Sequence, residues 1–430
     1  HPMGIEMLTP SQTACKMTAA HISEGRVKAM QAAAGVGLVQ GPAHGVTLSD
    51  LDGNTYIDCR SAGGVFNLGH TRAQIAEVLA KAVQDTDMGD WMLLSGIRAI
   101  TAKKLASLAP EGLDHVQFGV TGSEAVEVAC KLARGTTGRE KLVAMTNAYH
   151  GFSGFALATA PEDLIAPYGP LTPGIVAIPH GDLAAAESMI DDETAAVLLE
   201  TVQGSGGVVL PPEGYLAGLR ALCDRHGALL IFDEVQAGLG RTGKLFSFEH
   251  WGVVPDMVVI GKALGGGYYP ISACLYNARV LDFVNVRPLA HPSTFSGSEL
   301  GCMVAQKALD LLSDPALLAN VEAMGARLAR GYGTLQAAFP DFVLGHRQIG
   351  LFTGLDTPDA ETGKALRHAA VRAGLIAFTA PFQPQVLQIW PPLVITKDEI
   401  DELLLRLTHA VREAADSFNE TNTHTRANGT

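Results

Sequence analysis

The chain has 430 residues, enough for two or three structural units around a large hydrophobic core. Its composition, 47% hydrophobic and 17% charged, is that of an ordinary globular protein. The formal net charge of −13 argues against a nucleic-acid partner, because a protein that binds phosphate backbones needs a basic face.

The cysteines and the apolar runs predict a cytoplasmic protein with no metal site and no membrane partner. Six cysteines are scattered singly, with no CxxC pair and no histidine cluster at zinc spacing, so we expect free thiols in a reducing compartment. No uninterrupted apolar stretch is long enough to span a bilayer, and the N-terminus has no signal-peptide pattern.

The first 60 residues, with Asp52-Gly53 as a hairpin turn, differ in pattern from residues 61–310. In the latter, apolar runs without polar alternation predict parallel strands covered on both faces. These runs are residues 115–120, 141–146, 174–178, 195–200, 228–233 and 257–261. Amphipathic segments such as 124–134 and 215–226 lie between them, so we expect a large α/β domain with a mostly parallel sheet flanked by helices.

Residues 311–416 change pattern again, and we expect them to form a small α+β domain together with residues 1–60. An apolar stripe predicts a helix from Pro315 to Gln336. Short strands at 350–355 and 386–389 and a last helix at 398–414 follow. The polar residues 417–430 predict a disordered tail.

Polar residues stand at the ends of several predicted strands, where ligands bind in open α/β sheets. LLIFDE brings Asp233 and Glu234, VVIGK brings Lys262, and AVLLE brings Glu200. AMTNAYHG brings Tyr149 and His150, and Gly122 and Ser123 follow the strand at 115–120 where a helix begins.

These residue types fit one cofactor. The N–H groups of Gly122 and Ser123 at a helix N-terminus suit a phosphate, and Tyr149 can stack on a flat ring. A buried carboxylate such as Asp233 can keep a ring nitrogen protonated. A partly desolvated Lys262 can attack an aldehyde as a neutral amine. A phosphate, a protonated pyridine ring and an aldehyde together describe pyridoxal 5'-phosphate.

Each residue taken alone has an ordinary structural explanation. A Gly-Ser pair at a helix start is usually a cap, Tyr149 can close the edge of a core, and Asp233 can be a satisfied structural acid. Lys262 can extend to solvent. The segment GKALGGG lacks the spacing of a dinucleotide-binding loop. Only the coincidence of all four features at successive strand ends favours the cofactor.

Longer stretches resemble the class III (ornithine/ω-amino acid type) aminotransferases, pyridoxal-phosphate-dependent enzymes of fold type I. The most specific are FDEVQAGLGRTG at 232–243 and PDMVVIGKALGGG at 255–267. The resemblance extends from about residue 40 to 410. Further matching stretches within it are LDGNTYID, GSEAVEVACKLAR, NAYHG, HPSTFSGSELGC and PPLVITKDEI.

The resemblance implies a role for each matching residue. Lys262 would form the Schiff base with the cofactor and later move the proton, and Asp233 would pair with the pyridine nitrogen. Glu200 matches the acid of a Glu-Pro motif, with Thr201 here in place of the proline. The remaining cofactor contacts would be Gly122 and Ser123 on the phosphate, Tyr149 and Val235 on the two ring faces, and Gln236 on the ring hydroxyl. Thr294 would reach the phosphate of the neighbouring subunit, which implies a homodimer.

Two positions depart from the ornithine-type members. These members carry a glutamate where ETVQGS has Ser205, and an arginine where LQIWPPL has Gln388. The arginine binds the substrate α-carboxylate, so its loss leaves open whether Arg60, Arg347 or another residue is the anchor. Trp91 lies where family members line the substrate pocket, although a core tryptophan is equally compatible with the sequence.

The sequence therefore predicts an aminotransferase that moves an amino group from a small amine or amino acid to a keto acid. A racemase, epimerase or decarboxylase of the same family is the alternative. Ser205 resembles the serine of the family's dialkylglycine decarboxylase branch, although that branch keeps the arginine. A cofactor-binding regulator is disfavoured, because no basic helix-turn-helix segment is present.

Overall fold

A computed structural model describes residues 8–427 of the chain, with side chains as far as Asn419. Its largest element is a seven-stranded sheet in the order β4-β10-β9-β8-β7-β5-β6. The strands are β4 (His115–Gly119), β5 (Lys141–Met145), β6 (Ile175–Ile178), β7 (Thr194–Glu200), β8 (Leu229–Asp233), β9 (Met257–Ile260) and β10 (Ser272–Tyr276).

Only β10 runs against its neighbours, since it pairs antiparallel with both β4 and β9. The mostly parallel α/β sheet and its six predicted strands are thus confirmed, while β10 was not predicted. Its segment SACLY comes after the residues GGGYYPI, whose glycines and proline are typical of turns and obscure a strand beside them.

Successive residues of each strand belong to two different cores, as the period of two requires. Val197, Leu199 and Phe232 pack on one face, beneath helices α4, α8, α9 and α11. Leu198 and Ile231 pack on the other, beneath α5, α6 and α10. The helices of this lobe are α3 (Ala73–Asp85), α4 (Gly96–Leu108), α5 (Gly122–Thr137), α6 (Gly154–Ala158), α7 (Glu162–Ile165), α8 (Leu183–Met189), α9 (Tyr215–His226), α10 (Ala278–Val286) and α11 (Glu299–Leu312).

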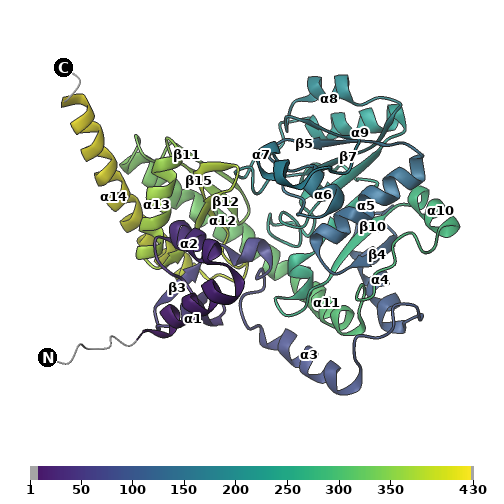
Figure 1. Cartoon of the computed structure of the whole chain (residues 1–430), viewed down its shortest axis with the longest axis horizontal. Coiled ribbons are helices and arrows are strands. Elements are labelled where there is room, and N and C mark those ends of the chain that lie inside the picture. Colours follow the sequence, from purple (N-terminus) through teal and green to yellow (C-terminus); the bar gives the residue numbers. More distant parts are fainter. Residues whose placement is uncertain (1–7, 428–430) are drawn as a thin grey trace.

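A second lobe combines both ends of the chain, as Figure 1 shows at the left. Its strands are β1 (Gln40–His44), β2 (Thr47–Asp50), β3 (Thr55–Asp58), β11 (Gly345–Ile349), β12 (Phe352–Asp356), β13 (Leu375–Ile376), β14 (Phe378–Ala380) and β15 (Gln383–Ile389). Its helices are α1 (Pro10–Thr18), α2 (Glu24–Ala34), α12 (Pro315–Ala338), α13 (Ala360–Arg372) and α14 (Lys397–Ala427).

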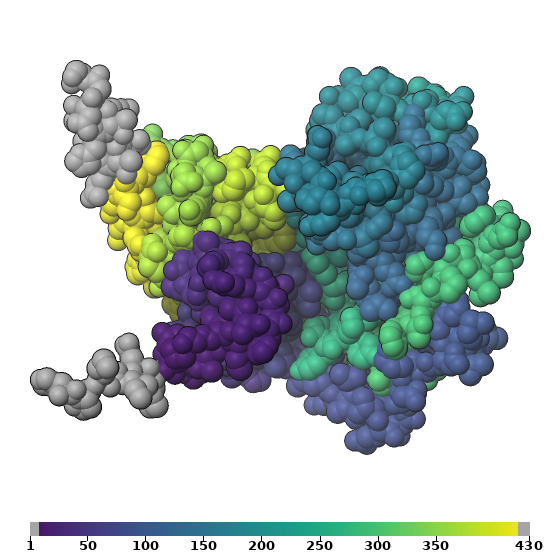
Figure 2. Space-filling view, viewed as in Figure 1, coloured from purple at the N-terminus to yellow at the C-terminus, as the bar shows by residue number. Residues whose placement is uncertain are grey.

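Pairing between β3 and β13 joins the two ends, since Ile57 and Leu375 are parallel partners. Figure 2 shows the purple N-terminal segment packed against the yellow-green C-terminal one. The expected turn at Asp52-Gly53 connects the antiparallel strands β2 and β3. The domain boundaries at residues 60 and 310 stay predictions.

The predicted disordered tail is not what the structure describes. Helix α14 continues to Ala427, so residues 417–427 are helical, and residues 428–430 lie outside the described part. Phe418 packs edge-on against Phe342, with ring centroids 5.9 Å apart, and no glycine or proline interrupts the helix beyond it. Across the described residues, none of the helices has the length and apolarity that crossing a bilayer requires.

A fully buried arginine links the two lobes. Arg241 follows the β8 segment, and its guanidinium donates to the Leu351 and Pro391 carbonyl oxygens, at 3.0 and 2.6 Å, and to Asn67 Oδ1 at 2.7 Å. Burial lowers the pKa of Arg241 to about 9. Its hydrogen bonds therefore connect the central sheet's loops with β12 and the segment after β15.

We expect Arg241→Met to reduce the free energy of unfolding by at least about 2 kcal/mol, because a buried acceptor left unpaired costs about 1–3 kcal/mol. Urea denaturation followed by circular dichroism measures this loss. Arg279→Met is the matched control, since Arg279 is exposed and donates one hydrogen bond to the Gly227 carbonyl oxygen. Equal losses in the two variants would contradict the structural role of Arg241.

Candidate active site

The strand order brings the predicted acids and the lysine to one edge of the sheet. Glu200 and Asp233 end the parallel strands β7 and β8 and are partners in register. Asp233 is in turn the register partner of Val259 in β9, and Lys262 follows that strand. Adjacent strand ends thus place two carboxylates beside one amine.

Lys262 begins a short 3-10 turn in the left-handed backbone region, with φ of 45°. Its Nζ donates to the Gly63 carbonyl oxygen at 3.1 Å. Burial lowers the pKa of Lys262 to about 8, although Asp233 and Glu200 oppose this shift. A substantial share of the amine is therefore neutral near physiological pH, which a nucleophile requires.

Asp233 is held by a buried histidine that had no assigned role in the sequence analysis. Its Oδ2 lies 2.6 Å from His150 Nδ1, and its Oδ1 accepts from the Val235 backbone N–H at 3.0 Å. Burial opposes a charge on His150, but Asp233 and Glu200 outweigh that effect and raise the His150 pKa. The motif NAYHG could have indicated a role for His150 in the sequence, because His150 directly follows Tyr149, the candidate for stacking on the ring.

Glu200 and Glu234 are both buried, and burial raises the pKa of each to about 7. Glu200 accepts from the backbone N–H groups of Tyr149, at 3.1 Å, and Gly204, at 3.3 Å. Thr201, which replaces the family's proline, donates its hydroxyl to Glu234 Oε1 at 2.9 Å. The substitution therefore provides a partner for a buried acid.

The N-terminus of α5 faces the same region. Thr121 caps it by accepting from the Glu124 N–H, while the Glu124 carboxylate accepts from Val120 N, so only half of a capping box is formed. Ser123 Oγ lies 2.5 Å from Ser153 Oγ. A Cβ on Gly122 would lie 3.0 Å from Val235 Cγ1, so a larger residue here would require Val235 to shift.

A cavity of about 360 Å³ opens between these elements, lined among others by Thr121, Gly122 and Lys262. Gln236 lies close by, since a Cβ added to Gly63 would be 3.8 Å from its Nε2. Its buried Oε1 has no hydrogen-bond partner in the described part of the chain. Tyr149 is half-buried, with its ring 5.8 Å from that of Phe152.

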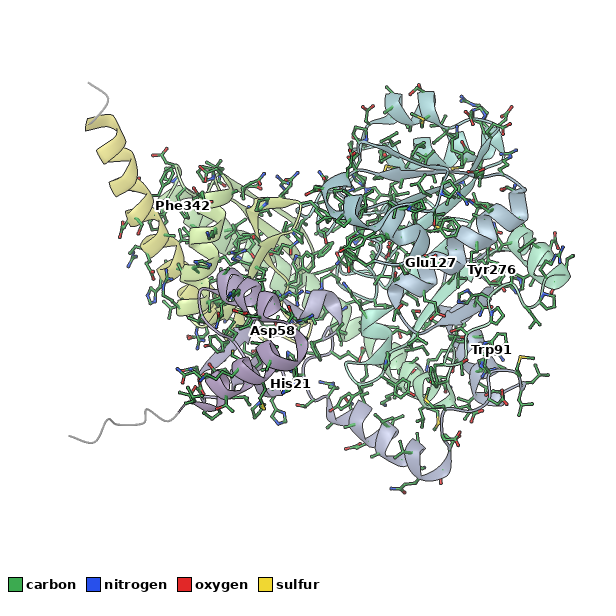
Figure 3. All side chains as sticks on the ribbon, in the orientation of Figure 1. His21, Asp58, Trp91, Glu127, Tyr276 and Phe342 are labelled. Atoms are coloured by element: carbon green, nitrogen blue, oxygen red, sulfur yellow. The ribbon has the colours of Figure 1, made fainter. Side chains whose placement is uncertain are left out.

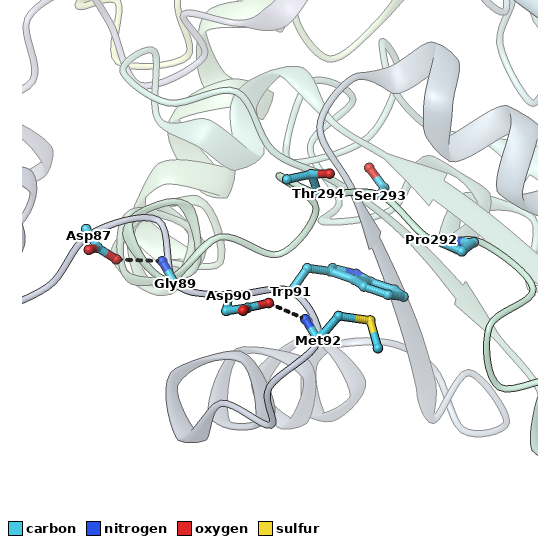
Figure 4. A pocket seen from close by; sticks show the side chains of 8 residues that line it. All are labelled: Asp87, Gly89, Asp90, Trp91, Met92, Pro292, Ser293 and Thr294. Atoms are coloured by element: carbon cyan, nitrogen blue, oxygen red, sulfur yellow. Dashed lines mark hydrogen bonds between the residues drawn. The ribbon is translucent and has the colours of Figure 1, made fainter.

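Trp91 and Thr294 lie elsewhere. Both line a separate cavity of about 800 Å³, together with Pro292 and Ser293 (Figure 4). In Figure 3, Trp91 is far from Asp58, which precedes the Arg60–Gly63 turn. Within one chain, Trp91 and Lys262 thus line different cavities, and the substrate contact of Trp91 stays a prediction.

Gln388, one of the two positions that depart from the ornithine-type pattern, contacts the backbone next to the other, Ser205. Gln388 Nε2 donates to the Gly204 carbonyl oxygen at 2.7 Å, immediately before Ser205. Ser205 is buried, and its carbonyl oxygen accepts from Phe382 N at 3.1 Å. A neutral amide contact thus stands at the positions where those members are expected to carry an arginine and a glutamate.

The chain was compared with known proteins. The profile of the family "Aminotransferase class-III" matches residues 31–411. An uncharacterized aminotransferase of Archaeoglobus fulgidus is 42% identical over 381 residues, 89% of this chain and 90% of that protein. The putrescine aminotransferase of Pectobacterium atrosepticum is 35% identical over 368 residues, 83% of this chain and 79% of that protein.

A solved structure agrees with this likeness. The ornithine aminotransferase of Toxoplasma gondii superimposes with a TM-score of 0.88 at 27% identity, covering 95% of this chain and 97% of that one. The fold is therefore fold type I, as expected, and enzymes of this class depend on pyridoxal 5'-phosphate. The chain belongs to the class III aminotransferases.

Proposed function

We propose that the enzyme transfers the amino group of a small amine or amino acid to a keto acid. The observation that carries the proposal is the placement of Lys262, whose pKa burial lowers to about 8, opposite the hydrogen-bonded pair of Asp233 and His150. A nucleophilic amine and a buried carboxylate on neighbouring strand ends suit chemistry at a protonated pyridine ring.

The residues present fit pyridoxal 5'-phosphate. The first turn of the 16-residue helix α5 offers free N–H groups to a phosphate at Gly122 and Ser123. The unpartnered Gln236 Oε1 suits the hydroxyl of the ring, and Tyr149 and Val235 are the candidates for its two faces. The absence of a side chain at Gly63 keeps the space beside Lys262 Nζ open.

When bound, pyridoxal phosphate supplies a reactive aldehyde and a ring that withdraws electrons from the substrate's Cα. Lys262 would hold the aldehyde carbon through its neutral amine, and its Nζ would be the group that moves the proton of the substrate's Cα. Asp233 would keep the proton on the ring nitrogen, and His150 orients Asp233 through the 2.6 Å hydrogen bond. Glu200 fixes the Tyr149 backbone, so it is a positioning residue.

A small amine donor is favoured by the neutral contact between Gln388 and the Gly204–Ser205 backbone, which offers no cation to a donor's α-carboxylate. The likeness to a putrescine aminotransferase supports the same choice. Racemisation and decarboxylation on the same scaffold differ in which Cα bond is broken, and the test below distinguishes them.

We expect amine donors to convert the yellow pyridoxal form to the pyridoxamine form, and pyruvate to restore it, as followed by absorbance. Lys262→Ala should abolish turnover and covalent trapping of the cofactor by borohydride without changing the circular dichroism spectrum. The exposed Lys244 provides the matched control, Lys244→Ala. A cofactor that never reaches the pyridoxamine form would favour the racemase or decarboxylase alternative.

We expect Gly63→Ala to weaken cofactor binding by about tenfold or more, since a clash of about 1.4 kcal/mol has that effect on Kd. A Cβ there would lie 2.7 Å from Lys262 Nζ, at a φ of +71° that disfavours other residues. Titration of the apoprotein with pyridoxal phosphate measures the change. Gly53→Ala carries similar backbone strain, at φ +90° with no atom within 4 Å, and should bind normally.

We also propose a homodimer in which Thr294 completes the phosphate site of the other subunit. The exposed Thr294 lines a different cavity from Lys262 of its own chain, which supports a role in another subunit's site. Sedimentation velocity should give twice the 45.1 kDa chain mass, and Thr294→Ala should weaken cofactor binding. A monomer that retains full affinity for the cofactor would refute the shared site.

A further inference from the structure

The proposed reaction needs a cation for the carboxylate of its keto-acid acceptor, and Gln388 does not supply one. The inference below rests on that proposed function. Three arginines lie near enough to be considered: Arg60, Arg241 and Arg347. Their hydrogen bonds and exposure distinguish them.

Arg241 and Arg347 are already engaged. Arg241 is fully buried and donates to three protein acceptors that join the lobes. Arg347 forms an ion pair with Asp356, with Nη2 and Oδ1 3.1 Å apart, and also donates to the Gly207 carbonyl oxygen. A substrate carboxylate would have to break these contacts.

Arg60 is exposed, and within the described chain its guanidinium has no hydrogen bond or ion pair. It lies over the ring of Phe378, with 5.6 Å from Cζ to the centroid. Phe378 in β14 is the register partner of Gln388 in β15. The unpaired guanidinium of Arg60 therefore lies beside the β14–β15 strand pair. Gln388 in that pair occupies the position at which the ornithine-type members carry their arginine.

The backbone of Arg60 is tied to the reactive amine. Asp58 Oδ1 accepts from the N–H groups of Arg60, at 2.8 Å, and Ser61, at 2.9 Å. The Arg60 carbonyl oxygen accepts from Gly63 N at 2.9 Å, and Gly63 in turn accepts from Lys262 Nζ. One turn of chain thus separates the cation from the reactive amine.

This turn is strained and firmly held. Ser61 and Ala62 adopt positive φ values of 49° and 48°, which L-residues avoid, and Ser61 Oγ donates to the Trp390 carbonyl oxygen at 2.7 Å. Among the influences on the Lys262 pKa, burial is the largest, and the Arg60 charge acts in the same direction. The held backbone thus positions the Arg60 guanidinium, whose charge lowers the pKa of the Lys262 amine.

We infer that Arg60 is the carboxylate anchor of the site, taking the role that Gln388 cannot perform. A guanidinium binds a carboxylate through two parallel hydrogen bonds, and stacking on Phe378 leaves its N–H edge free for them. The substrate class is then a carboxylate-bearing keto-acid acceptor that extends from Lys262 toward Phe378.

The test uses the pyridoxal form of the wild type and of Arg60→Gln, Arg60→Lys and Arg347→Gln. Succinate, an unreactive dicarboxylate, is titrated calorimetrically, and the half-reaction with n-butylamine, which has no carboxylate, is followed by absorbance. Arg60→Gln should weaken succinate binding by about 10- to 100-fold, the effect of losing one or two charge-assisted hydrogen bonds.

Arg60→Lys should fall between Arg60→Gln and the wild type, and Arg347→Gln should bind succinate normally. All four proteins should react with n-butylamine at similar rates. Unchanged succinate binding in Arg60→Gln, no succinate binding by the wild type, or an equal loss with n-butylamine would each overturn the assignment. Failure of wild-type turnover with every amine would count against the proposed function instead, since succinate binding decides the role of Arg60 separately.

Discussion

Burial of one amine beside two carboxylates is the constraint on which the rest of the site depends. Removing Lys262 from water lowers its pKa, while Asp233 and Glu200 pull in the opposite direction, so the value of about 8 is a balance of burial and charge. His150 adds a third group, because it shares Asp233 through a short hydrogen bond and is itself influenced by Glu200. Parallel strands with matched ends make this arrangement possible, as they deliver side chains to the same edge.

Many of the polar residues at this edge of the sheet could be predicted from the sequence. Each buried parallel strand is a continuous apolar run, so the polar residue that ends the run marks the end of the strand. Asp233, Glu200 and Lys262 were found in that way. The 2.6 Å contact between His150 and Asp233 could not be predicted, since it joins a loop residue to a strand end 83 residues away. Strand β10 was not predicted because the glycines and proline just before SACLY are typical of turns.

The direction in which each arginine side chain points could not be predicted from the sequence either. The sequence does not distinguish the environments of the three arginines. In the structure Arg60 is exposed, Arg241 bridges the lobes and Arg347 is paired with Asp356. Helix α14 extended past the expected boundary because its polar end has no residue that stops a helix and Phe418 finds a ring to pack on. The polar composition of this segment predicted a solvent-exposed tail, but a packing contact from another part of the chain extends the helix.

The parallel pairing of β3 with β13 has a consequence for synthesis of the chain. Ile57 emerges from the ribosome long before Leu375, its partner. The strands of the central sheet, which lie between them in the sequence, are complete by Tyr276 and can collapse first. The edge of β3 that faces β13 therefore has no partner until Leu375 and Ile376 have been made, so the second lobe is completed after the central sheet.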